Sequence, residues 1–89
     1  MLTVTEAASA HLEKMLKQKE VPEGTAVRFV DDGDGVVLRQ DTQRDGDAAF
    51  QHNGRTVLLL DARMSELLAK DTLDLKDSEL TLRRPKEGE

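Results

Sequence analysis

The stretch from residue 48 to residue 60 predicts a β-hairpin. Ala48–His52 and Arg55–Leu60 are two runs of β-favouring residues. The Asn53-Gly54 pair between them is the strongest short-range hairpin signal, because both turn positions need a positive φ. The second run ends in four consecutive apolar residues and should be the better buried strand. The middle of the chain is therefore expected to contain two strands joined by a tight turn.

Two helices are predicted, each after a residue that can cap it. Thr5 can cap a helix that ends near Lys19, because Pro22 disfavours helical geometry in the residue before it. The apolar stripe of that helix consists of Ala8, Leu12, Met15 and Leu16. Asp61 can cap a second helix, whose apolar residues at helical spacing are Met64, Leu67 and Leu68.

The remaining apolar runs are short and predict strands. They span residues 2–4, 26–30, 36–38, 73–75 and 80–82. Residues 40–47 are polar and are predicted to form a connection without core residues. Two short helices cannot cover every apolar strand face, so strands must pack on strands. The predicted class is α+β, a small, mostly antiparallel, β-sandwich-like domain over residues 1–85, with a solvated tail at 86–89.

Charge and cysteine content exclude several function classes. Eighteen acidic against thirteen basic residues give a net charge of -5, which disfavours nucleic acid and anionic membrane surfaces as partners. The first residues carry neither a basic segment nor an apolar one, so a cytoplasmic protein is expected. The 89 residues contain no cysteine, and therefore no thiolate ligand or cysteine nucleophile. Two isolated histidines and three serines without a glycine elbow form no catalytic triad, so no enzyme activity is expected.

The order of these elements, with several residues inside them, resembles the HesB-like or IscA-like family of A-type iron-sulfur cluster carriers. The residues that carry the resemblance are Leu2-Thr3-Val4-Thr5-Glu6-Ala7-Ala8, Val27-Arg28-Phe29, Asn53-Gly54, the apolar strand ending in Asp61, the helix from Ser65 to Leu68, Leu73-Asp74-Leu75 and Leu80-Thr81-Leu82-Arg83-Arg84-Pro85. The resemblance implies the family's fold over nearly the whole chain.

The family's ligands are absent from this sequence. The resemblance implies one cysteine in a glycine-flanked loop, and here that loop is Gly33-Asp34-Gly35, with Asp34 nearest to the cysteine position. A carboxylate is a hard ligand and a poor substitute for a thiolate in holding an iron-sulfur cluster. The resemblance then implies a cysteine-less, non-enzymatic accessory or interaction module in or near iron-sulfur protein maturation, without a bound cofactor. Dimers are common in the family, so a homodimer is one expectation.

Acidic segments offer the only candidate metal ligands. Asp31, Asp32 and Asp34 could give oxygen ligands to Mg²⁺, Ca²⁺ or Fe²⁺, and we predict Asp32 and Asp34 as the ligands. The alternative is a solvated turn, in which Asp and Gly are common for their backbone behaviour. Residues 41–47 partly match a calcium loop, but His52 stands where a bidentate Glu belongs.

A short basic cluster, Arg83, Arg84 and Lys86, follows the last predicted strand. It could steer an acidic protein surface, so we predict partner binding at Arg83 and Arg84 and at the loop glycines Gly33 and Gly35. The cluster could instead be a solvated strand end, or could pair with the acidic loop of the same chain. Three hypotheses stay open: the accessory module, a small carboxylate-based metal-binding protein, and a purely structural or oligomeric domain.

Overall fold

The predicted hairpin is formed, with its first strand at the edge of a four-stranded sheet. In the computed structural model, which describes residues 1–84, strand β4 (Ala48–His52) pairs antiparallel with β5 (Arg55–Leu60). Asn53 and Gly54 both have positive φ, of 52° and 79°, which is the geometry that the Asn-Gly turn supplies. Residues 57–60 of β5 are all buried, so the prediction of the better buried strand is confirmed.

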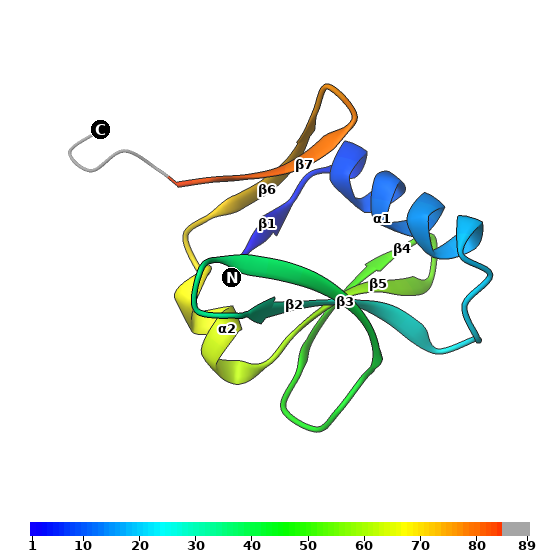
Figure 1. The fold of residues 1–89 in the computed structure, drawn as a ribbon, viewed down its shortest axis with the longest axis horizontal. Coiled ribbons are helices and arrows are strands. Elements are labelled where there is room, and N and C mark those ends of the chain that lie inside the picture. Colours follow the sequence, from blue (N-terminus) through cyan, green and yellow to red (C-terminus); the bar gives the residue numbers. More distant parts are fainter. Residues whose placement is uncertain (85–89) are drawn as a thin grey trace.

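Two sheets and two helices make up the domain (Figure 1). One sheet has four strands in the order β3-β2-β5-β4, and the other has three in the order β1-β6-β7. Each sheet is mixed, because β2 runs parallel to β5 and β1 runs parallel to β6. The other elements are β1 (Thr3–Val4), α1 (Glu6–Gln18), β2 (Thr25–Asp31), β3 (Val36–Thr42), α2 (Ala62–Leu67), β6 (Thr72–Lys76) and β7 (Glu79–Arg83). The predicted α+β class is confirmed.

The residue that caps α1 also contacts strand β6 near the other end of the sequence. Thr5 accepts a hydrogen bond from the amide of Ala8 at 3.2 Å, as an N-cap does. The same hydroxyl donates to Asp74 Oδ1 in β6 at 2.9 Å. One threonine hydroxyl therefore links the cap of the first helix to the three-stranded sheet.

The core lies between α1 and the two sheets. Leu12 and Leu16 of α1 are almost fully buried and belong to one cluster with β2, β5, β6 and α2. Burial of one such side chain contributes roughly 1.5–3 kcal/mol. The buried apolar residues of the cluster are Leu2, Ala8, Leu12, Leu16, Val27, Phe29, Val57, Leu58, Leu60, Met64, Leu68 and Leu73.

The prediction for residues 40–47 is wrong at the start of the segment. Strand β3 continues to Thr42, so Gln40–Thr42 belongs to the sheet. None of residues 40–47 belongs to the apolar core, as predicted, although the Asp47 side chain is only 3% exposed. The polar composition hid the strand, since an edge strand needs few apolar residues.

The C-terminal boundary of the predicted domain cannot be compared with the structure. The predicted boundary after residue 85 and the tail at 86–89 lie outside the described residues. No helix within residues 1–84 has the length and apolar character needed to span a membrane.

Candidate functional site

The loop between β2 and β3 holds the carboxylates that the sequence suggested as metal ligands. Its backbone turns sharply, with Gly33 at φ 96° and Gly35 at φ 153°. Asp31 Oδ1 accepts the amide of Gly33 at 2.8 Å, and Asp32 Oδ1 accepts the amide of Asp34 at 2.9 Å. All five residues are exposed. Two of the three carboxylates therefore have an oxygen engaged in holding the turn itself.

Within residues 1–84, no group of three histidine, aspartate or glutamate side chains is placed to hold a metal ion. Asp32 and Asp34 lie in one exposed turn, but no third such ligand joins them. No buried polar side-chain atom in the described part of the chain lacks a hydrogen-bond partner, so none points to a missing ion. The metal site at Asp32 and Asp34 stays a prediction that depends on the loop alone.

A buried ion-pair network in the four-stranded sheet is the feature that the sequence analysis missed. Arg28 of β2 is only 7% exposed. Its Nε donates to Asp41 Oδ2 at 2.8 Å, and its Nη1 donates to Asp47 Oδ1 at 3.0 Å. A further bond from Nη2 reaches the carbonyl of Thr42 at 3.2 Å. One guanidinium group therefore holds the end of β3 and the start of β4 together.

Each charge in this network favours the ionised form of its neighbour. Hydrogen bonding to Asp47 raises the pKa of Arg28 above its usual range. The bond from Arg28 in turn lowers the pKa of Asp47. The amide of Thr42, followed by Arg28, lowers the pKa of Asp41. Because the guanidinium keeps its proton, the network suits a structural role and cannot transfer protons.

The network also explains the partial match to a calcium loop. Asp41 and Asp47, at the two ends of that segment, are both bound to Arg28. Arg44 Nη2 lies 2.9 Å from Asp41 Oδ2 as well. The Asp41 carboxylate, a ligand in the calcium pattern, therefore faces two guanidinium groups. The sequence signal for such partners was Arg28, the charged residue in the otherwise apolar run of residues 26–30, since a buried charge needs a partner.

The basic residues at the end of β7 pair with carboxylates of their own sheet and the turn before it. Arg83 Nη2 donates to Asp74 Oδ2 at 3.1 Å, and Arg84 Nε lies 3.4 Å from Asp71 Oδ1. Pairing with the acidic loop, the alternative raised above, is not what the described residues show. The two arginine side chains remain 64% and 72% exposed, so both can still meet a partner. Lys86 lies outside the described residues.

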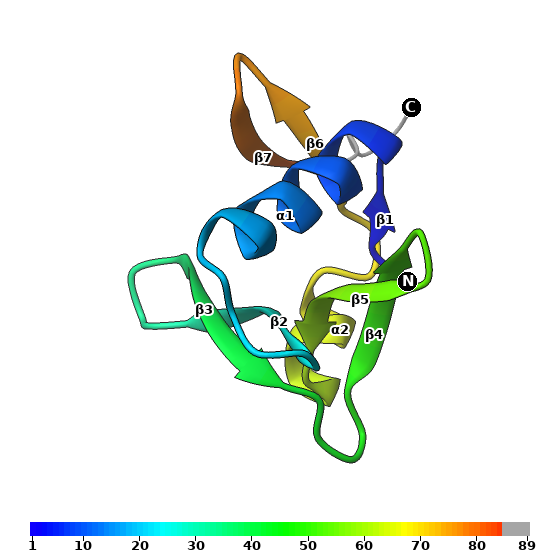
Figure 2. The ribbon, with the colours of Figure 1, turned by 90° about the vertical axis from the view of Figure 1, so that its right-hand side faces the viewer.

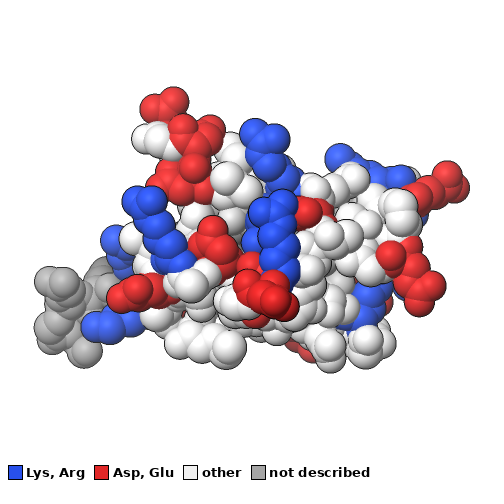
Figure 3. All heavy atoms as spheres, turned by 90° about the horizontal axis from the view of Figure 1, so that it is seen from below, with Lys and Arg blue, Asp and Glu red and all other residues white. Residues whose placement is uncertain are grey.

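The two predicted partner-binding elements do not form one patch. Figure 1 shows the β2–β3 loop and the end of β7 at the same end of the molecule, whereas Figure 2 shows them on opposite sides of it. Seen from below in Figure 3, basic and acidic side chains alternate over the surface. A partner that touched both elements would have to reach across the molecule.

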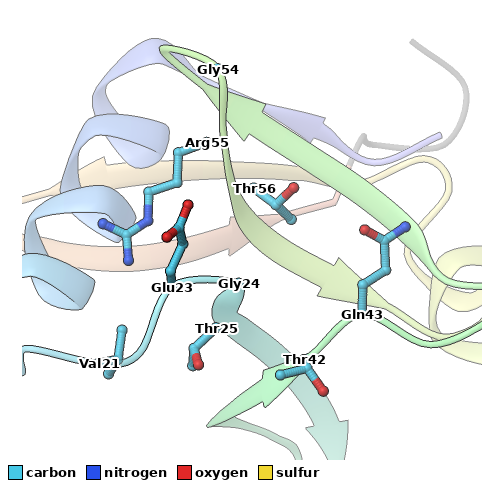
Figure 4. A pocket seen from close by; sticks show the side chains of 9 residues that line it. All are labelled: Val21, Glu23, Gly24, Thr25, Thr42, Gln43, Gly54, Arg55 and Thr56. Carbon is cyan, nitrogen blue, oxygen red and sulfur yellow. The ribbon is translucent and has the colours of Figure 1, made fainter.

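A hollow lies where β2 and β5 begin and β3 ends (Figure 4). Its volume is about 820 Å³. Arg55 and Glu23 extend toward each other on one side, and Thr56 and Gln43 stand on the other. Its lining contains no histidine, cysteine or serine, so it offers none of the usual nucleophile and base pairs.

Comparison with solved structures identifies proteins with a similar fold. No family model and no curated protein matches this chain. Among solved structures, Escherichia coli SufA is 20% identical, with a TM-score of 0.60 over 92% of this chain and 81% of SufA. The chain has the fold of SufA. A protein from Aquifex aeolicus is 21% identical, with a TM-score of 0.62 over 94% of this chain and 91% of its own.

The likeness to SufA confirms the predicted resemblance at the level of the fold. SufA is described as involved in the biosynthesis of iron-sulfur clusters. The donor set of this chain does not fit such a cluster, because its 89 residues contain no cysteine and clusters are held mainly by thiolates. Asp34 lies in an exposed turn of this fold. The chain therefore has the fold of SufA but no cysteine thiolate to hold a cluster.

Proposed function

We propose that this protein is a non-enzymatic accessory or interaction module in or near iron-sulfur protein maturation, acting in the cytoplasm without carrying a cluster itself. The observation that carries the proposal is a SufA fold over 92% of a chain without cysteine. A domain of this kind can contact the partners of a cluster carrier through its shape and surface, while the cluster stays on another protein.

Two surfaces support a binding role. The turn around Gly33 and Gly35 is exposed on every residue and held by its own hydrogen bonds, so it presents a fixed shape. Arg83 and Arg84 keep most of their side-chain surface exposed although each has a carboxylate neighbour. Exposed cations on an acidic protein can orient an acidic partner and raise its association rate.

The test is to mix the protein with a cluster-loaded A-type carrier and an apo-ferredoxin. Sedimentation velocity measures the complex, and visible circular dichroism follows cluster transfer. We expect a complex and a changed transfer rate, with the cluster signal never associated with this chain. A complex that fails to form, together with an unchanged transfer rate, would refute the proposal.

A matched pair of variants locates the contact. Arg83→Gln/Arg84→Gln should weaken the complex about tenfold, a loss within the range of one charged contact across an interface. Lys14→Gln/Lys17→Gln removes the same charge from exposed positions of α1 and should leave the affinity unchanged. Equal loss in both variants would mean that net charge, and no particular surface, governs the association.

A further inference from the structure

Strand β3 is an open edge of the four-stranded sheet. It pairs with β2 at all seven positions, and no strand of residues 1–84 pairs with its other side. Figure 2 shows β3 as the outermost strand on its side of the sheet, below the second half of α1. An open edge presents unpaired backbone donors and acceptors, which can accept another strand.

The other outer strands are less suited to strand addition. β4 has an irregular register between Phe50 and Gln51, β1 has two residues, and β7 has five. β3 has seven residues and contains neither a bulge nor a proline. Its last residue is already engaged, since the Thr42 amide donates to Asp41 Oδ1 and the Thr42 carbonyl accepts from Arg28. The free part of the edge is therefore residues 36–40.

An apolar groove runs beside this free edge. Val36 is 37% exposed and Leu38 is 43% exposed, which makes them two of the few large apolar residues open to water. Leu38 also lines a groove of about 50 Å³ between β3 and α1, whose other apolar walls are Met15, Leu16 and Val27. A strand added to β3 would direct every second side chain toward this face.

Two cations flank the free edge. Lys19 stands beside the groove, and Arg39, which follows Leu38 on the strand, points to the opposite face of the sheet, where Arg28 also lies. Neither takes part in an ion pair among the described residues. The acidic residue of the strand, Asp41, is already paired with Arg28 and Arg44. Two free cations on a chain of net charge -5 favour an acidic occupant. A second copy of the chain would bring the same two cations to the free edge.

We propose that β3 and the groove beside α1 bind an extended segment of another protein, in which apolar and acidic residues alternate, by strand addition. The apolar side chains enter the groove over Leu38 beside Lys19, and the acidic ones, which point to the other face of the sheet, meet Arg39. This inference is independent of the proposed function, because it requires no iron-sulfur protein as the partner.

The test begins with a displayed library of random dodecapeptides selected against the intact protein. We expect selected sequences in which acidic and apolar residues alternate, and NMR shifts at residues 36–40 and 15–19 when one of these peptides is added. Selection without such alternation, or shifts confined to other residues, would overturn the proposal. So would the failure of any peptide to be enriched.

Variants separate the groove from general charge effects. Leu38→Glu and Lys19→Glu/Arg39→Glu should each weaken binding of the selected peptide about tenfold or more. Lys14→Glu/Lys76→Glu makes the same charge change away from the groove and should bind as the unmodified protein does. Thermal unfolding checks that each variant is folded. The protein could instead self-associate and bind no peptide. If Leu38→Glu abolished that self-association, the edge would belong to a second copy of the chain and the proposal would be rejected.

Discussion

The two acidic connections of the four-stranded sheet look alike in sequence and differ in the structure. Residues 31–35 and 41–47 are both rich in aspartate and glycine. In the first, the carboxylates are exposed and accept hydrogen bonds from the turn itself. In the second, Asp41 and Asp47 bind the buried Arg28. The role of an acidic loop is therefore decided by what lies opposite it, and composition alone does not reveal this.

The largest effect should follow from removing the guanidinium group. Arg28→Met leaves Asp47 buried without its partner, and breaking such a pair costs about 3 kcal/mol of unfolding free energy. Arg39→Met is the matched control, because Arg39 lies opposite Arg28 on β3 and is exposed. Urea unfolding measures both variants. Equal stability of the two would contradict the structural role of the network.

A smaller loss is expected when the charge of one carboxylate is removed. Asp47→Asn keeps an acceptor oxygen but weakens the bonds from Arg28, at a cost of about 1–2 kcal/mol. Asp32→Asn, in the exposed loop, should leave the urea midpoint unchanged. If both changes had the same effect, the contrast between the two loops would not hold.

Acid should destabilise the folded protein in part through Asp47 of the network. The pKa of Asp47 is lowered in the folded protein by the hydrogen bond from Arg28, so the unfolded chain takes up a proton at a higher pH than the folded chain. Stability from this group is complete above the unfolded pKa of about 4 and is lost as pH falls through the lower folded value. Urea midpoints at about pH 3 and about pH 7 should differ less in Asp47→Asn than in the unmodified protein.

If the variant and the unmodified protein lost equal stability between about pH 7 and about pH 3, Asp47 would not be the source of the pH dependence. The loss of stability would then come from other carboxylates. Asp41 and Asp74 are the candidates, because backbone amides of Thr42 and Leu75, respectively, lower their pKa values most.

Much of the fold follows from local chemistry that a sequence displays. The Asn53-Gly54 turn and the caps at Thr5 and Asp61 each need only residues within a few positions, and all three occur as predicted. The Arg28 network joins residues 13 and 19 positions apart. Its partners depend on which strands become neighbours, and this pairing is set by the whole sheet.

The candidate site was less predictable for the same reason. The sequence placed acidic and basic residues at Asp32, Asp34, Arg83 and Arg84, and it could not show that the loop lies apart from the end of β7. Nor could it show that Arg83 is already paired with Asp74, since that contact requires the register of β6 with β7. Side-chain chemistry can be listed from a sequence, whereas its assembly is a property of the fold.

The central claim is that this chain keeps the SufA fold without the cluster chemistry. Anaerobic purification without chelator, followed by supply of iron and sulfide, tests it through iron analysis and the visible absorption spectrum. The account predicts no cluster-like band and no stoichiometric iron. Stoichiometric metal without a cluster-like band would support the carboxylate site instead, provided that Asp34→Ala abolishes metal binding. A cluster-like band with stoichiometric iron would contradict the account, because ligands other than thiolates of this chain would then hold a cluster.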